Sequence, residues 1–355
     1  MSKTQTGGHF NQMPPFTAQR LTSAEFGLIF RNLPPASAGQ IPMRSTKISR
    51  LLAPWVIIGG VCLCAHPRLA AEAPAGRPTI WVLGDSTARN SGRGHDGQPV
   101  EGWGTPLADF FDPAKVTVEN VAHAGQSSRT YYTIPNDWPR VSTLIRPGDF
   151  VLLVFGINDG GPPTTPRSRG SIPGLGDETM ELPRPDGTAE TVHTYGWYMT
   201  AMATGARDRG AQVYLLTVTT RNIWTNPQVK YRDGTPLGPL PADYDPRQDR
   251  IERGTGHGEY TAWTEGLGVM LHLPVLDLTN LCADRYEAMG REAVNALYSD
   301  HNHTYVPGAE LVAATIVSGL KAFPNSPFLP LLSEKGRALP TADPRYVSAN
   351  PAPAP

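Results

Sequence analysis

The sequence contains few cysteines. Of its 355 residues only 3 are cysteine, at Cys62, Cys64 and Cys282. The first two lie in an apolar N-terminal stretch, so a processed chain would retain Cys282 alone, which excludes a disulfide framework. Cys62 and Cys64 could form a metal-binding or redox pair. Because this C-x-C spacing has no later cysteine partners, small apolar residues in a leader are the favoured interpretation.

The sequence also lacks an excess of charge of either sign. Lys plus Arg number 31 and Asp plus Glu number 32, which gives a formal net charge of -1. This balance gives no electrostatic reason to expect nucleic acid or an anionic membrane as a partner. The hydrophobic content of 39% is sufficient for a substantial core, and the 36 glycines and 36 prolines predict long, turn-rich connections.

The N-terminal region has the composition of an export signal. Residues 1–42 show no clear periodicity, so we expect either a non-functional extension or translation that starts at Met43. Basic residues follow Met43, then an apolar run over residues 51–65 that is too short to cross a bilayer, then small residues. This order predicts a signal peptide over residues 43–73 and a secreted or periplasmic protein without membrane contact after processing. A single membrane anchor is the alternative.

From residue 77 to residue 335, apolar runs rich in β-branched residues alternate with helical patterns, which predicts one domain. The expected strands are Thr79–Leu83, Val116–Val121, Phe150–Phe155, Gln212–Val218 and Pro274–Leu278. The expected helices are Trp103–Phe111, Thr191–Asp208, Tyr260–Leu267, Cys282–Gly290 and Pro307–Ala322. Such alternation predicts a parallel sheet with helices on both faces.

Three other segments are expected to lie outside this regular core. The Gly/Pro-rich insertions Gly160–Pro185 and Thr225–Gly254 predict long surface loops. Residues 336–355 are rich in Pro and Ala and predict a loose tail. No internal repeat is visible in the sequence, and we expect a monomer.

A serine follows the first predicted strand, in Gly84-Asp85-Ser86-Thr87. In a sheet of this kind, ligands bind beyond the carboxyl ends of the strands. Glycine permits a sharp turn here, which would place Ser86 where the next helix begins. Free backbone N–H groups at that point would stabilise the oxyanion that forms when a serine attacks a carbonyl. The alternative is that Ser86 only caps the helix.

Two further blocks follow the next two predicted strands. Gly125 could bring its backbone N–H close to a bound carbonyl, because a glycine permits close approach of the chain to a ligand. Asn158, in Gly156-Ile157-Asn158-Asp159-Gly160-Gly161, could donate a side-chain N–H to an oxyanion. For both residues the alternative is an ordinary turn.

Near the C-terminus the sequence reads Asp300-His301-Asn302-His303. A carboxylate three residues before a histidine can accept the Nδ1 proton and leave Nε2 to take a proton from a serine. Asp300, His301 and His303 could instead bind a metal ion, since the spacing of the two histidines permits it. For His301, a place in a polar loop without a chemical role is a further alternative.

Together, the blocks at Ser86, Gly125, Asn158 and His303 resemble the SGNH (GDSL) hydrolase family. The resemblance implies a flavodoxin-like α/β/α three-layer sandwich with a central parallel five-stranded sheet. It implies that Ser86 is the nucleophile, His303 the base and Asp300 the group that orients the base. It also implies an oxyanion hole formed by the backbone N–H groups of Ser86 and Gly125 and the Asn158 side chain, with no metal or cofactor.

Longer segments, from Thr79 to about Ala322, resemble the rhamnogalacturonan acetylesterase branch of that family. They are Gly102–Gly104, Gly125–Arg129, Phe155–Gly161, Thr191–Tyr198, Arg221–Trp224 and Asp300–Thr304. The resemblance implies a secreted esterase that removes acetyl groups from an acetylated plant polysaccharide, with rhamnogalacturonan expected, through an acetyl-Ser86 intermediate. The departures are Ile157, where that branch often has His, and the length of Thr225–Gly254. A lipid esterase or thioesterase, or a non-catalytic carbohydrate-binding protein, remains as an alternative.

Aromatic side chains close to these motifs could form platforms for sugar rings. They are Trp103, Tyr131, Tyr132, Trp197 and Trp224. For each of them, packing in the core is the alternative, and it is preferred for Trp197, which is predicted to lie within a helix. His193, at the start of that helix, is expected to be structural.

Overall fold

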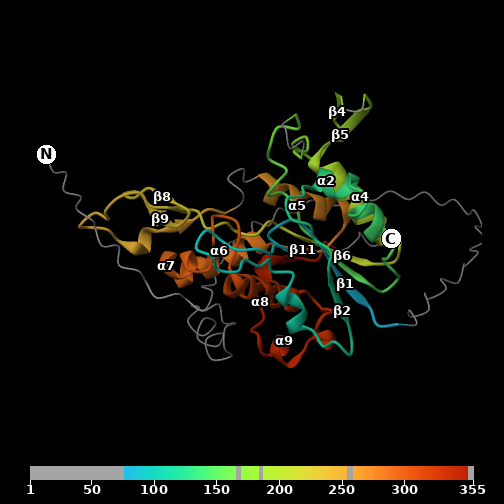
Figure 1. Cartoon of the computed structure of the whole chain (residues 1–355). Helices are drawn as coiled ribbons and strands as arrows, with labels where there is room; N and C mark the ends of the chain where they lie inside the picture. The colour runs from blue at the N-terminus through green and yellow to red at the C-terminus, as the bar shows by residue number, and fades with distance from the viewer. Residues whose placement is uncertain (1–75, 165–168, 184–186, 254–258, 351–355) are drawn as a thin grey trace, which may run out of the picture.

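The computed structural model describes residues 76–350 except 165–168, 184–186 and 254–258 (Figure 1). The predicted extension at residues 1–42 and the predicted signal peptide at residues 43–73 lie outside the described residues. In the described ranges, no helix is long and apolar enough to span a membrane. Cys282 is fully buried among apolar side chains, and this burial raises the pKa of its thiol to about 12.

The centre of the fold is a six-stranded sheet with the strand order β12-β11-β6-β3-β1-β2. Neighbouring strands from β2 to β11 are parallel, and β12 pairs antiparallel with β11. The strands are β1 (Thr79–Leu83), β2 (Thr117–Asn120), β3 (Phe150–Leu153), β6 (Gln212–Leu216), β11 (Val275–Leu276) and β12 (Val347–Ser348). The five parallel strands are those expected from the sequence, so the predicted α/β architecture is confirmed.

Alternate residues of each strand pack into separate cores on the two faces of the sheet, because successive side chains of a strand point to opposite faces. Ile80 and Val82 lie in one core, whereas Trp81 and Leu83 lie in the other. Because both faces of the sheet are buried, the strand sequences are continuous apolar runs and do not alternate between apolar and polar residues.

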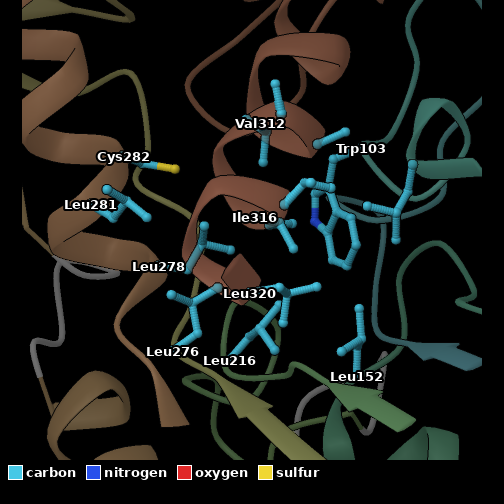
Figure 2. Close-up of a cluster of buried hydrophobic side chains, with 14 of the residues drawn as sticks. Trp103, Leu152, Leu216, Leu276, Leu278, Leu281, Cys282, Val312, Ile316 and Leu320 are labelled. Atoms are coloured by element: carbon cyan, nitrogen blue, oxygen red, sulfur yellow. The ribbon is translucent and has the colours of Figure 1, made fainter. Parts of the chain in front are cut away.

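Helices cover each face (Figure 1). Against the core that contains Trp81 pack α2 (Ser128–Thr133), α3 (Trp138–Ser142), α4 (Tyr195–Arg207) and α5 (Glu259–Leu271). On the other face lie η1 (Pro106–Phe110), α6 (Leu278–Met289), α7 (Arg291–Asn295), α8 (Val306–Ala322), η3 (Leu329–Leu331) and α9 (Glu334–Ala338). Figure 2 shows this second core, in which α8 residues such as Ile316 lie between Trp103 and the apolar side chains of α6 and the sheet.

Three helix predictions are wrong by more than one residue in where the helix begins, or in its type. The expected helix over Thr191–Asp208 begins only at Tyr195, where the Thr194 side chain accepts the Trp197 N–H at 3.0 Å and caps α4. Its first residues belong instead to β5 (Ala189–His193), which pairs antiparallel with β4 (Thr179–Pro183). The segment Trp103–Phe111 forms only the 3-10 helix η1. Helix α6 begins four residues earlier than expected, because Asp277 caps it.

The two insertions are not simple loops as predicted. The first contains β4, and the second contains two short hairpins. These are β7 (Trp224–Thr225) with β10 (Arg250–Ile251) and β8 (Tyr231–Arg232) with β9 (Thr235–Pro236), and η2 (Pro246–Gln248) lies between β9 and β10. The buried carboxylate of Asp249 accepts hydrogen bonds from the Tyr231 hydroxyl at 2.8 Å and the Arg291 guanidinium at 3.2 Å, which fastens the second insertion to α7.

Residues 336–350, which the sequence predicts to be part of a loose tail, are also part of the fold. Strand β12 and η4 (Pro344–Tyr346) follow α9, and Val347 pairs with Leu276 of β11. Leu339 and Tyr346 are buried in the core beneath α8. Without β12, the backbone N–H and C=O groups along one side of β11 would form an open sheet edge. Pairing with this edge gives Val347–Ser348 its strand conformation.

Candidate active site

Three loops with the predicted chemical groups meet at one edge of the sheet. Strand β1 lies between β2 and β3, and in a parallel sheet the carboxyl ends of neighbouring strands share one edge. The loops that follow are joined by hydrogen bonds: the His123 N–H donates to the Gly84 carbonyl at 3.0 Å, and the Asn158 side chain donates to the Gln126 carbonyl at 2.8 Å. The segments that contain Ser86, Gly125 and Asn158 are therefore neighbours in space.

Ser86 lies in a tight turn, not at the start of a helix. The buried Asp85 carboxylate accepts the Thr87 N–H at 2.8 Å and the Thr87 hydroxyl at 2.9 Å, and this closes the turn. The next helical element, η1, begins only at Pro106. The expectation that a helix N-terminus activates Ser86 is therefore wrong. Glycine fits well just before the turn, because a Cβ at Gly84 would lie 3.1 Å from the Val154 carbonyl oxygen, closer than an ordinary van der Waals contact.

The structure brings Ser86, His303 and Asp300 into one hydrogen-bonded chain. The Ser86 Oγ lies 2.9 Å from His303 Nε2, and His303 Nδ1 lies 2.7 Å from Asp300 Oδ2. With Nδ1 protonated and donating to Asp300, Nε2 is left to accept the serine proton. The other Asp300 oxygen accepts the backbone N–H groups of Asn302 at 2.7 Å and His303 at 2.8 Å, which fixes the carboxylate.

The electrostatics of this pair favour a basic imidazole. Partial burial acts to raise the pKa of Asp300, but hydrogen bonds from the His303 ring and from two backbone N–H groups hold it well below its usual range. The same bond to Asp300 raises the pKa of His303 above its ordinary value of 6.5, although burial acts in the opposite direction. Asp300 is therefore ionised near neutral pH and stabilises the protonated ring.

Hydrogen-bond donors are available beside the serine. In the described residues, the backbone N–H groups of Ser86 and Gly125 have no hydrogen-bond partner. Gly125 has a φ of 81°, a conformation that favours glycine. The Asn158 amide gives one N–H to Gln126 and retains a second one. These are the three donors that the sequence predicts for an oxyanion.

Asp159 connects two segments of this site, although its place beside Gly160 in the sequence suggests only a turn. Its side chain is fully buried and accepts hydrogen bonds from the hydroxyls of Ser128 and Ser171, and burial raises its pKa to about 6. It thereby connects the Asn158 loop to α2, which directly follows the Gly125 loop. No sequence signal identifies it, because Ser128 of α2 and Ser171 lie 31 and 12 residues away along the chain.

His301 and His303 bind different carboxylates. The His301 Nδ1 lies 3.0 Å from Asp233 of the second insertion, whereas His303 contacts Asp300 and Ser86. Among the residues that the structure describes, no group of three or more His, Cys, Asp or Glu residues has the arrangement of a metal site. His193 stacks on Trp197 at a ring separation of 3.8 Å, as expected for a structural residue.

Most of the aromatic residues near the motifs are not sugar platforms. Trp103, Tyr131 and Trp224 are buried in the two cores, so the alternative of core packing holds for them. Tyr132 and Trp197 are only partly buried, and their rings meet edge to face at 5.3 Å. These two remain accessible to a ligand.

The fold and this arrangement of groups are those of a hydrolase that uses an activated serine. The chain belongs to the GDSL-like lipase/acylhydrolase family, which residues 82–311 match, and it is a carboxylic ester hydrolase. The matched residues lie within the domain expected from the sequence at residues 77–335. The resemblance to SGNH (GDSL) hydrolases is therefore confirmed.

Among its relatives, the chain is similar to a rhamnogalacturonan acetylesterase of Emericella nidulans. The two are 31% identical over 248 residues, which are 68% of this chain and 86% of the relative. YesY of Bacillus subtilis, named a probable rhamnogalacturonan acetylesterase, is 22% identical over 68% of this chain and 92% of its own length. The solved structure of Bacillus subtilis YxiM covers 70% of this chain and 57% of that chain, with 21% identity and a TM-score of 0.48.

Proposed function

We propose that the protein is an exported acetylesterase that removes acetyl groups from rhamnogalacturonan. The contact of 2.9 Å between Ser86 Oγ and His303 Nε2 is the observation that carries the enzymatic part of the proposal. The choice of acetyl group and polymer is supported by the similarity to two relatives that bear that name. Export is supported by the signal-like pattern of residues 43–73.

In the first half of the reaction, Ser86 is the nucleophile. His303 takes the Ser86 proton through Nε2 while the serine oxygen forms a bond to the acetyl carbonyl carbon. The negative charge that develops on the carbonyl oxygen is stabilised by the backbone N–H groups of Ser86 and Gly125 and by the Asn158 amide. The bond to the sugar oxygen then breaks, and His303 returns the proton to that oxygen, which leaves acetyl-Ser86.

In the second half, water replaces the sugar. His303 takes a proton from water, whose oxygen attacks the acetyl carbon, and the same three donors stabilise the second oxyanion. The bond to Ser86 breaks, acetic acid leaves, and His303 returns the proton to the serine oxygen. Asp300 remains ionised throughout and stabilises the charged ring.

The pH dependence of the reaction follows from the raised pKa of His303. The base must be neutral to accept a proton, so kcat/KM falls as the pH decreases through the pKa of this ring. Because the bond to Asp300 raises that pKa, we expect the acid limb of the profile to lie above pH 6.5. Asp300→Asn removes this stabilisation of the protonated ring and should shift the limb to lower pH. A limb that does not move in this variant would contradict the pairing.

The substrate is tested by measuring the release of acetate from two polymers. We expect kcat/KM to be at least about tenfold higher with acetylated rhamnogalacturonan fragments than with acetylated xylan of similar length. On p-nitrophenyl esters, the acetate should be preferred to long-chain esters. A preference for xylan would contradict the assigned polymer, and a preference for long acyl chains would contradict an acetylesterase.

A further inference from the structure

Arg169, in the first insertion, contacts the backbone of Gly125, one of the proposed oxyanion donors. Its Nη1 donates a hydrogen bond to the Gly125 carbonyl at 3.1 Å. A Cβ placed on Gly125 would lie 3.8 Å from that nitrogen, so the guanidinium also lies beside the bare Cα of the glycine. In the proposed reaction, the backbone N–H of Gly125 donates to the acetyl carbonyl oxygen. The positively charged guanidinium therefore contacts the same residue whose N–H is a proposed oxyanion donor.

Arg169 differs from three partly or fully buried arginines of this fold that pair with a carboxylate. Arg129 pairs with Glu190 at 2.8 Å, Arg221 with Glu252 at 3.1 Å and Arg291 with Asp249 at 3.2 Å. Within the described ranges, Arg169 is half-buried and forms no ion pair with a carboxylate. Partial burial of an unpaired guanidinium costs free energy, and binding of an anion offsets that cost.

Asp85 is the carboxylate whose pKa the Arg169 charge affects, but it forms no ion pair with Arg169 in the described residues. Burial raises the pKa of Asp85, and this outweighs the opposite effects of hydrogen bonds from Thr87 and of the His303 and Arg169 charges. The Asp85 carboxylate is occupied by the Thr87 N–H and hydroxyl. A guanidinium has five N–H donors in a planar fork, and the bond to Gly125 occupies one of them. Among the residues that the structure describes, the other donors have no acceptor, so they can serve a ligand.

We propose that Arg169 binds the carboxylate of a uronate residue in the substrate, at or next to the acetylated sugar. This rests on the proposed function, since the galacturonate of rhamnogalacturonan carries such a carboxylate. The acetyl carbonyl must approach the Gly125 N–H, and the carboxylate of the same sugar ring is only a few bonds away. The fork of an arginine matches a carboxylate with two parallel hydrogen bonds. Arg169 is thus a specificity-determining residue for anionic over neutral esters.

The test compares two substrates that differ only in this charge. They are an acetylated galacturonate-containing oligosaccharide with free carboxylates and the same oligosaccharide with methyl-esterified carboxylates. For the native enzyme we expect kcat/KM to be about 10- to 100-fold higher with the free acid, mainly through KM, as fits the loss of a charged hydrogen bond. Arg169→Gln should remove this preference, and Arg169→Lys should restore part of it.

Arg209→Gln is the matched control. The Arg209 Nη1 also donates to a glycine carbonyl, that of Gly205, at 3.0 Å, but Arg209 is exposed and precedes β6 at the opposite edge of the sheet. This variant loses the same charge and should retain the preference for the free acid.

Three outcomes would overturn the inference, and they differ in what they say of the proposed function. If the native enzyme hydrolyses both oligosaccharides equally well, or if Arg169→Gln lowers kcat/KM equally for both, Arg169 only positions the Gly125 peptide. In either case the acetylesterase proposal stands. If the native enzyme releases acetate from neither oligosaccharide while it hydrolyses p-nitrophenyl acetate, the proposed polymer is wrong and the inference fails with it.

Discussion

Ser86→Ala should lower kcat by about 10⁵- to 10⁶-fold, because the variant has no hydroxyl to form the acetyl intermediate. The remaining turnover would come from the oxyanion donors and from binding alone. Ser86 is only 8% exposed, and among the described residues its side chain forms one hydrogen bond, to His303, so removal of the hydroxyl should leave the fold unchanged. Hydrolysis of p-nitrophenyl acetate measures the loss, and circular dichroism with thermal unfolding checks the fold.

Ser91→Ala is the matched control for this variant. Ser91 is exposed and lies five residues further along the same segment, so we expect native turnover from it. A fluorophosphonate reagent should label the native protein at Ser86 and leave the Ser86→Ala variant unlabelled. A folded Ser86→Ala protein that retains more than about one hundredth of native kcat would exclude this residue as the nucleophile.

His303→Ala should cause a loss of similar size, about 10⁴- to 10⁶-fold in kcat. The variant lacks the imidazole that accepts the serine proton, and within the part of the chain that the structure describes Asp300 then keeps the backbone donors of Asn302 and His303 alone. The effects of the two variants should not add, since the serine and the histidine act as one unit. The double variant Ser86→Ala/His303→Ala should therefore be about as active as either single variant.

His301→Ala provides the comparison for the histidine. It removes an imidazole from the same loop, but one that bonds to Asp233 of the second insertion. We expect a far smaller effect on kcat than in His303→Ala. Equal losses of kcat in the two variants would contradict the role of His303 as the single base and would favour a site that uses both histidines.

The sequence predicts the parts of the molecule that depend on local pattern. The five parallel strands are visible as apolar runs, because both faces of each strand are buried. The blocks at Ser86, Gly125 and Asn158 follow three of these strands, and parallel topology brings their ends to one edge. The pairing of His303 with Asp300 is also local, since three residues separate them.

Several of the errors concern contacts between distant residues. Thr191–His193 fits a helical pattern in sequence, but pairing with Thr179–Met180 and neighbouring residues makes it a strand. Val347–Ser348 has no strong strand pattern and is ordered because β11 offers an unpaired edge. One buried carboxylate that helps to hold the second insertion is Asp249, whose partners lie up to 42 residues away. Such networks leave no periodic signal in a single sequence.

The 217 residues that separate Ser86 from His303 have a practical consequence. The loop that contains His303 follows every parallel strand of the sheet in the sequence and directly precedes α8. The Thr304 hydroxyl holds this loop by donating a hydrogen bond to the Glu101 carbonyl at 2.8 Å. Ester cleavage therefore requires the whole chain from β1 to α8 to have folded. A simple colorimetric assay thus reports refolding from β1 to α8, since a fragment that stops before residue 300 has a nucleophile without a base.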